Sequence, residues 1–75
     1  MQYSDGTIIT LGDKVLISGQ YIGIVVADID GDKYSKTNPK NKWAYLQNGI
    51  IIDTDFAGLV HYQQETLINE TLERK

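Results

Sequence analysis

Residues 11–32 most constrain how this chain can fold, because two runs of strand-forming residues flank a short turn there. The first run covers 14–17 and the second covers 21–27, and both are rich in the β-branched residues that favour strands. Gly19 lies between the two runs and is able to adopt the positive φ that a tight reversal requires. This stretch therefore predicts a β-hairpin around which the rest of the chain folds.

Alternation separates the two faces of the first strand of this hairpin. Val15 and Ile17 share one face, and Lys14 and Leu16 share the other. The second strand is apolar on both faces, which is typical of a strand that is covered on both sides. Gly23 within it indicates a bulge, a sharp bend or a close approach of another backbone.

Two more strands are predicted downstream of the hairpin. Residues 49–54 form an apolar run, residues 55–58 contain turn formers, and residues 59–62 predict the returning strand. Nearer the N-terminus, residues 7–10 predict either a short strand or an extended arm against the sheet. The fold class is therefore mainly β, with a single small domain over residues 1–75.

Two helical segments are also predicted. Asn38 and Pro39 favour a helix start, so one or two helical turns are expected over 39–48, although an irregular loop held by Trp43 is the alternative. Ile68 and Leu72 are four residues apart, which predicts a short amphipathic helix over 65–73.

Charge and composition restrict the partners. The net charge is −3, from ten acidic and seven basic residues. Nucleic-acid binders neutralise phosphates with lysine and arginine, so nucleic acid is an unlikely partner and a basic protein surface is favoured. There is no cysteine and no apolar run long enough for a membrane span, and the N-terminus does not have the pattern of a signal peptide. We expect a cytoplasmic location without membrane contact.

The hairpin resembles a KOW-type, SH3-like barrel. The matching pattern is Gly12-Asp13-x-Val15, Ser18-Gly19, Gly23-x-Val25-Val26 and Ile29-Asp30. The resemblance implies a highly curved antiparallel sheet of about five strands. Many KOW domains bind RNA or ribosomal proteins, but the matching segment here contains one basic residue, Lys14, against three aspartates.

The rest of the chain resembles small bacterial proteins of unassigned activity, some of which are similar to immunity proteins paired with secreted toxins. The pattern that carries this likeness is Asp5-Gly6-Thr7, Tyr34-Ser35, Pro39, Trp43-x-Tyr45-Leu46, Gly49 and Gly58-Leu59-x-His61-Tyr62. The resemblance implies a protein that binds and occludes a cognate toxin, with a basic toxin domain as the partner.

The candidate partner-binding residues fall into two sets, which are a set of aspartates and a set of aromatic residues in the segment 34–45. If the two hairpins bring their ends together, the aspartates form one acidic surface that could cap a basic active site. The alternative for the aspartates is that they are ordinary turn residues, and the alternative for the aromatic residues is that they pack in the barrel. The candidates are Asp28, Asp30, Asp32, Tyr34, Trp43, Tyr45, Asp53 and Asp55.

No cofactor or metal is expected. The aspartates at 28, 30 and 32 do not have the EF-hand spacing, and His61 lacks a partner set with recognisable ligand spacing. A histidine that holds a loop by hydrogen bonding is favoured over a general base oriented by Asp53 or Asp55.

The sequence therefore predicts a non-catalytic protein-binding module, most specifically a toxin-immunity protein. The alternative is an SH3-like nucleic-acid or ribosome-associated module that uses the lysines of residues 33–42 with Trp43 and Tyr45. The oligomeric state is left open, and pairing through an unpaired strand edge is one possibility.

Overall fold

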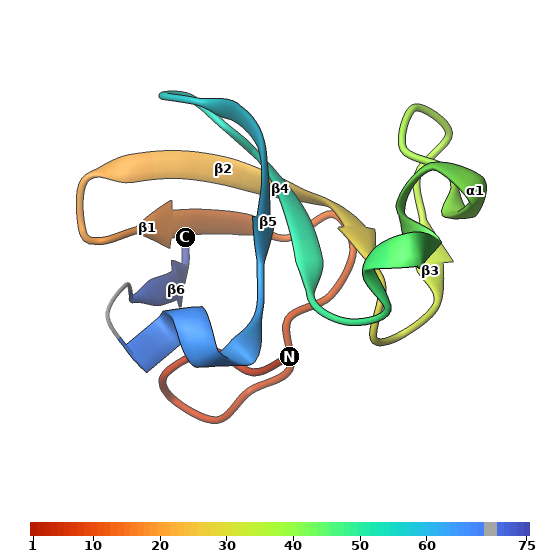
Figure 1. The fold of residues 1–75 in the computed structure, drawn as a ribbon. Helices are drawn as coiled ribbons and strands as arrows, with labels where there is room; N and C mark the ends of the chain where they lie inside the picture. Colours follow the sequence, from red (N-terminus) through yellow and green to blue (C-terminus); the bar gives the residue numbers. More distant parts are fainter. Residues whose placement is uncertain (69–70) are drawn as a thin grey trace.

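The hairpin at the centre of the computed structural model joins β1 (Lys14–Ile17) to β2 (Tyr21–Asp28) (Figure 1). The structure describes residues 1–68 and 71–75. The two strands pair antiparallel, with Lys14 opposite Ile24. Positive φ angles at Ser18 (52°) and Gly19 (73°) close the turn. The predicted hairpin and its glycine turn are thus confirmed.

Six antiparallel strands form one sheet within the described residues. Its path runs β5-β4-β2-β1-β6, and β3 pairs with β2 beside this path. The sheet is curved but not closed into a barrel, since β5 and β6 stand at the two ends of the path (Figure 1). The mainly β fold class is confirmed. The additional strands are β3 (Lys33–Tyr34), β4 (Ile50–Thr54), β5 (Gly58–Tyr62) and β6 (Leu72–Arg74).

The helical segments differ from the predictions in part. α1 (Lys40–Trp43) continues into the 3-10 helix η1 (Ala44–Leu46), so the turns expected over 39–48 are present. Asn38 does not cap α1; its side-chain oxygen accepts a hydrogen bond from Trp43 Nε1 at 3.1 Å instead. None of the helices in the described part of the chain is long and apolar enough to cross a membrane.

The amphipathic helix predicted over 65–73 is wrong at its C-terminal end. A 3-10 helix, η2 (Gln64–Ile68), is followed by β6, which pairs with β1 so that Leu72 lies opposite Ile17. The edge of β1 offers unpaired backbone groups, and pairing with it satisfies residues 72–74 better than a solvent-exposed helical turn. Residues 69–70 of the predicted helix lie outside the described part.

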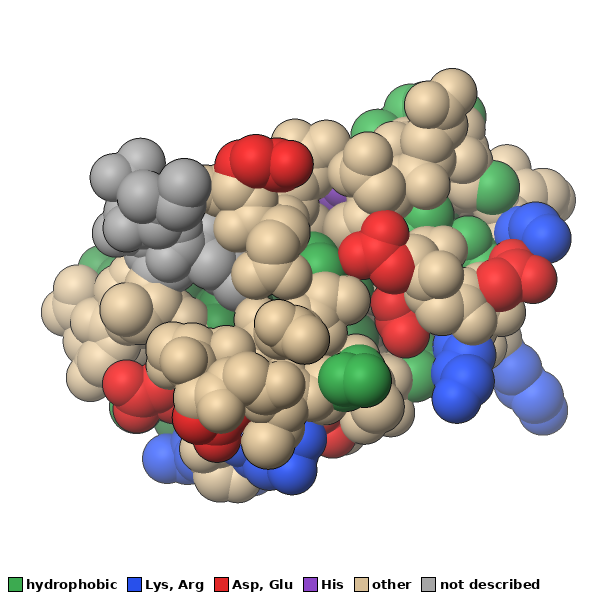
Figure 2. Space-filling view, turned by 90° about the horizontal axis from the view of Figure 1, so that it is seen from below, with side chains coloured by type: hydrophobic (Ala, Val, Ile, Leu, Met, Phe, Trp, Pro, Cys, Tyr) green, Lys and Arg blue, Asp and Glu red, His purple; other side chains and the backbone are tan. Residues whose placement is uncertain are grey.

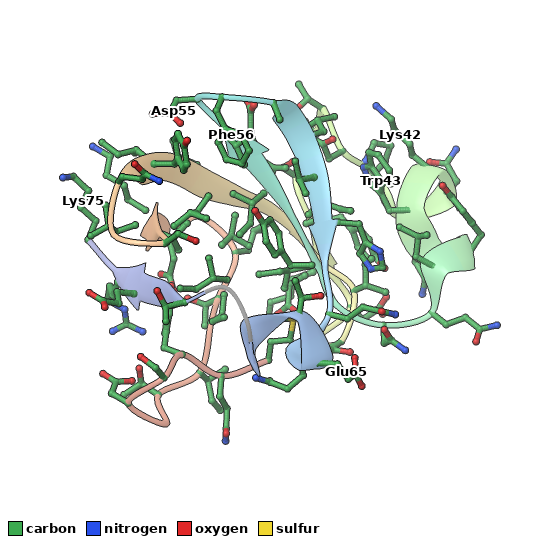
Figure 3. All side chains as sticks on the ribbon, turned by 60° about the vertical axis from the view of Figure 1, so that its left-hand side comes forward. Lys42, Trp43, Asp55, Phe56, Glu65 and Lys75 are labelled. Atoms are coloured by element: carbon green, nitrogen blue, oxygen red, sulfur yellow. The ribbon has the colours of Figure 1, made fainter. Side chains whose placement is uncertain are left out.

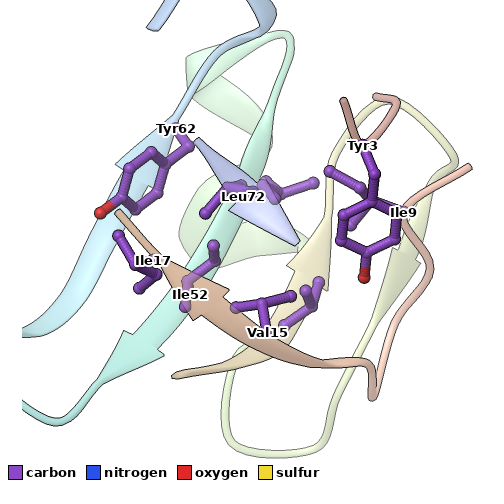
Figure 4. Packing of buried hydrophobic residues seen from close by; sticks show 9 residues of the cluster. Tyr3, Ile9, Val15, Ile17, Ile52, Tyr62 and Leu72 are labelled. Atoms are coloured by element: carbon purple, nitrogen blue, oxygen red, sulfur yellow. The ribbon is translucent and has the colours of Figure 1, made fainter. Parts of the chain in front are cut away.

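The main core lies on one face of the sheet. The predicted inward face of β1 is confirmed, because Val15 and Ile17 are buried while Leu16 is half-buried and Lys14 is exposed. Gly23 is needed at this face because a Cβ there would collide with the Ile52 side chain. The cluster, most of which is labelled in Figure 4, comprises Tyr3, Ile9, Val15, Ile17, Val25, Ile50, Ile52, Tyr62 and Leu72.

A β-bulge at Val26 sends part of the sheet's apolar surface to the opposite face. Val25 lies opposite Ile52, but Ala27 lies opposite Ile51, so Val26 is the extra residue in β2. Ala27, Ile51 and Ile29 form a second buried cluster, which the segment from β3 to η1 covers with Tyr34, Trp43 and Leu46. This segment projects from one end of the sheet (Figure 1).

The N-terminal arm packs through Tyr3, whose hydroxyl donates to Asp13 Oδ2 at 2.6 Å. Thr10 donates to the same carboxylate through its backbone N–H and its hydroxyl, each at 3.0 Å. Arg74 lies above the Tyr3 ring and 3.8 Å from Asp13 Oδ2. Residues 7–10 belong to no strand and have only an isolated bridge between Ile8 and Gln2, so they form the extended arm, one of the two predicted alternatives. Ile9 anchors this arm, since its side chain is fully buried.

This network links stability to acid pH. Partial burial raises the pKa of the Asp13 carboxyl, but hydrogen bonds from Tyr3 and Thr10, with the Arg74 charge, outweigh that effect and hold the pKa below 3.8. Between about pH 4 and the lower pKa of the folded state, the unfolded chain therefore binds more protons than the folded chain. The free energy of unfolding should accordingly fall as the pH drops through this interval. Urea midpoints measured from neutral to acid pH test this.

Asp13→Asn should flatten this acid limb, because the titrating group is lost while an oxygen acceptor stays. Asp55→Asn is the matched control, because the Asp55 side chain is exposed and the structure gives it no hydrogen bond within the described residues. An unchanged acid limb in Asp13→Asn would show that the network does not contribute to acid sensitivity.

Candidate functional site

The structure separates the predicted acidic residues into two groups at opposite ends of the sheet. β2 and β4 are antiparallel, so Asp28 lies opposite Ile50, whereas Asp53 lies opposite Ile24. Ile50 and Asp53 are three positions apart in β4, or about 10 Å at the usual rise of a strand. The prediction of a single acidic surface is therefore wrong, because the end of one hairpin meets the beginning of the other.

The aspartates at the end of β2 have intramolecular partners. Asp28 is 6% exposed, and its Oδ1 accepts a hydrogen bond from Gly31 N at 3.0 Å. Asp30 Oδ1 accepts from Gly49 N at 3.1 Å. Asp32 Oδ1 lies 2.9 Å from Lys40 Nζ. These three carboxylates organise the loops on either side of β3.

Of the aromatic residues in the segment from β3 to η1, two pack against the sheet and one lies on the surface. Tyr34 and Trp43 are half-buried against the second cluster. The Nζ atom of Lys42 lies 5.1 Å from the centre of the Trp43 ring and covers part of it. Tyr45 is 72% exposed and is the only one of the three that presents most of its side chain to solvent.

Lysines gather over the same segment, at the right-hand end of the molecule in Figure 2, where acidic side chains lie among them. Lys33, Lys36, Lys40 and Lys42 belong to this region. The pairing of Lys40 with Asp32 raises the pKa of the Lys40 amine through the hydrogen bond and the charge of the carboxylate. A continuous basic track with several exposed aromatic rings is not formed by the described residues.

The other end of the sheet presents an acidic and aromatic hairpin tip, which we define as Tyr21, Asp55 and Phe56. The rings of Tyr21 and Phe56 stack with centroids 4.4 Å apart, yet Phe56 stays 49% exposed. Figure 3 shows Asp55 and Phe56 together at the turn between β4 and β5. Asp55 has no ion pair with any described residue. Exposed aromatic rings are enriched at protein interfaces, where polar groups lie mostly at the rim.

Local hydrogen bonds hold the hairpin tip in place. Thr54 Oγ1 donates to Gly58 O at 2.8 Å and accepts from Ala57 N at 3.0 Å. Asp55 N donates to Ile22 O at 2.9 Å. Gly58 has a φ of 66°, which lets the chain reverse without side-chain strain. The tip is therefore displayed by a structured turn, which lowers the entropy cost of binding.

Sequence reasoning missed part of this end of the molecule. Ile24 and Leu59 are 45% and 42% exposed, and Phe56 joins them as a large apolar side chain in contact with solvent. A phenylalanine within a predicted turn was the available signal, because turn side chains are rarely buried. Ile24 gave no signal, since a strand that is apolar on both faces conceals which face is covered.

His61 has the structural role predicted for it. Its Nε2 lies 2.8 Å from the carbonyl oxygen of Asn48, so this nitrogen carries the proton and donates it. No group of three metal-ligating side chains occurs among the described residues. A cavity of about 380 Å³ lies between the N-terminal arm, η2 and β6, away from His61, with Glu65 as its one carboxylate among the described lining residues.

Comparisons of the chain with protein-family models, with curated proteins and with solved structures gave no match. The KOW-type and immunity-protein resemblances thus stay predictions.

Proposed function

We propose that this chain is a non-catalytic protein-binding module that recognises a basic partner through its hairpin tip. The observation that carries the proposal is the half-exposed Phe56 ring, stacked on Tyr21 beside the unpaired carboxylate of Asp55. Aromatic anchors contribute most of the energy at protein interfaces, and unpaired charges at their edge steer association and select the partner.

The proposed partner is a toxin, and the proposed effect is occlusion of its active site. Support comes from the charge of the molecule, which is −3, and from the two carboxylates Asp53 and Asp55 near one end of the sheet. A cleft that binds an anionic substrate is basic, and a rigid acidic hairpin has the shape and charge to fill it. The resemblance to immunity proteins points to the same class of partner.

A nucleic-acid module is the second candidate, and the segment from β3 to η1 offers it less support. Lys40 is paired with Asp32, and Trp43 is packed against the second cluster beneath Lys42. Single-stranded nucleic acid is usually held by several exposed rings along a basic groove, whereas only Tyr45 is largely exposed here.

The proposal is tested by pairing the chain with the product of the adjacent gene. Expression of that product alone should stop bacterial growth, and co-expression of the wild-type chain should restore growth. Phe56→Ala should weaken binding of the isolated product by about 30-fold, and Asp55→Lys by about tenfold, because one removes the anchor and the other reverses the steering charge. Titration calorimetry measures both.

Glu65→Lys is the matched control, because it makes the same charge change on η2, far from the hairpin tip in Figure 3. Its affinity should equal that of the wild type. If all three variants bind alike, the hairpin tip is not the interface. If instead the wild type binds single-stranded RNA tightly and with a steep salt dependence, the nucleic-acid candidate replaces the proposal.

A further inference from the structure

The outer face of the sheet, opposite the main core, carries an apolar strip that the chain itself leaves exposed. We define the outer face as Lys14, Leu16, Ile22, Ile24, Asp53 and Leu59, which alternate with the core residues along β1, β2, β4 and β5. Ile24 and Leu59 are nearly half exposed, and Leu16 and Ile22 are half-buried. The segment from β3 to η1 covers only the other end, around Ile51.

Four residues of the outer face form a straight row across the strands. Lys14 lies opposite Ile24, Ile24 lies opposite Asp53, and Asp53 lies opposite Leu59. Neighbouring strands are about 4.8 Å apart, so Lys14 and Asp53 flank Ile24 at nearly equal distances. Neither charge has an ion pair with a described residue, and both side chains are exposed.

The charges of the outer face are divided between its two sides. On the β1 side, Lys75 N donates to Lys14 O at 2.9 Å and the register thereby places Lys75 beside Lys14, whereas Glu73 lies on the same face opposite Leu16. The β4 side is acidic through Asp53. A half-turn about an axis that is parallel to β2 and lies above Ile24 exchanges the two sides and places Ile24 opposite Ile24 of the second copy. The row from Lys14 through Ile24 to Asp53 is therefore complementary in charge to the same row of a second copy.

We propose that two copies of this chain associate through their outer faces about such a two-fold axis. Ile24 packs against Ile24 of the second copy, and Lys14 and Asp53 of each copy pair with Asp53 and Lys14 of the other. Two sheets packed face to face lie about 10 Å apart, and apolar side chains from both faces fill the space between them. The contact is isologous, as in most homodimers.

The size of the molecule sets the strength of this association. A standard interface buries about 800 Å² per partner, which is roughly a sixth of the 4551 Å² that one copy exposes. The strip and its two charged flanks make up only part of the surface of one sheet face. The dimer is accordingly weak, with a dissociation constant of about 10–100 µM.

Sedimentation equilibrium over a concentration series tests the proposal on the isolated chain, and the result does not depend on the function of the hairpin tip. Lys14→Asp and Asp53→Lys should each weaken dimerisation at least tenfold, because each places like charges against one another. The double variant Lys14→Asp/Asp53→Lys should return to within about threefold of wild type, because the pairs are restored with reversed sign. Ile24→Asp should be monomeric throughout.

Lys33→Asp is the matched control, since it makes the same charge change on β3, outside the outer face, and should dimerise as the wild type does. Circular dichroism shows that each variant is folded. The proposal is overturned if the wild type is monomeric at about 1 mM. It is equally overturned if Lys14→Asp does not weaken the dimer, as expected for pairing along the β5 edge, or if the double variant stays as weak as the single variants.

Discussion

Replacing Gly49 by alanine should destabilise this protein by about 3 kcal/mol or more, since strain at positive φ contributes about 1–2 kcal/mol and overpacking about 1–3 kcal/mol. Gly49 has a φ of 94° and lies in the loop between η1 and β4, immediately before β4 begins. A Cβ at this position would collide with the Tyr62 carbonyl oxygen and lie 2.7 Å from His61 Nε2. The carbonyl oxygen belongs to the backbone of the paired strand β5, so it cannot move aside without disturbing the sheet.

The same residue also holds the loop after β2 through its backbone. Gly49 N donates to Asp30, and Gly49 O accepts from Ile29 N at 3.0 Å. A shift that relieved the collision would therefore weaken the loop after β2 as well. Because a domain of this size has little stability in reserve, Gly49→Ala should be largely unfolded at 25 °C in circular dichroism.

Gly6→Ala provides the matched control for this prediction. Its φ is 88°, close to that of Gly49, but an added Cβ would meet nothing within 4 Å. It should lose only about 1 kcal/mol from backbone strain. Gly6→Ala should therefore stay folded at 25 °C in circular dichroism, with a urea midpoint only slightly below that of the wild type. A Gly49→Ala variant as stable as Gly6→Ala would show that the contact with β5 is unimportant.

Trp43→Ala should reduce the free energy of unfolding by about 2–3 kcal/mol, somewhat less than for a fully buried tryptophan. The indole packs against the second cluster, and its Nε1 donates to Asn38. Its removal uncovers part of the second cluster and leaves Asn38, which is 5% exposed, without this bond. Urea unfolding followed by circular dichroism measures the change, because the variant lacks the only tryptophan.

Tyr45→Ala, two residues away, is the control for the aromatic segment. Its side chain is 72% exposed, so its loss should change stability by less than about 0.5 kcal/mol. Together the two variants decide whether this segment is core or binding surface. A stable Trp43→Ala with a destabilised Tyr45→Ala would show that Tyr45, and not Trp43, belongs to the core.

Much of the candidate site was beyond prediction for an identifiable reason. The aspartates at 28, 30 and 32 looked like a free acidic cluster, because a sequence does not show which carboxylates accept backbone hydrogen bonds. Asp30 bonds to Gly49, nineteen residues further along the chain. Asp55 was predicted correctly as an exposed residue of a turn, yet its grouping with Asp28 failed, because it required a strand direction that the sheet does not have.

The sequence by itself determined the local features: the hairpin of β1 and β2, the inward face of Val15 and Ile17, the turn before Gly58 and the loop-holding role of His61. These depend on side-chain alternation and turn chemistry over a few residues, which are readable without long-range contacts. The role of His61 alone needed a partner thirteen residues away, and the absence of ligand spacing was enough to favour it.

Only the tertiary structure decided the rest. One bulge at Val26 divided the core between two faces, and the unpaired edge of β1 converted residues 72–74 from a predicted helix into β6. The antiparallel register of β2 and β4 set which charges lie together, and so placed Lys14 and Asp53 on either side of Ile24. Pairing between distant segments follows from the total energy of the sheet, to which local propensity contributes only a small part.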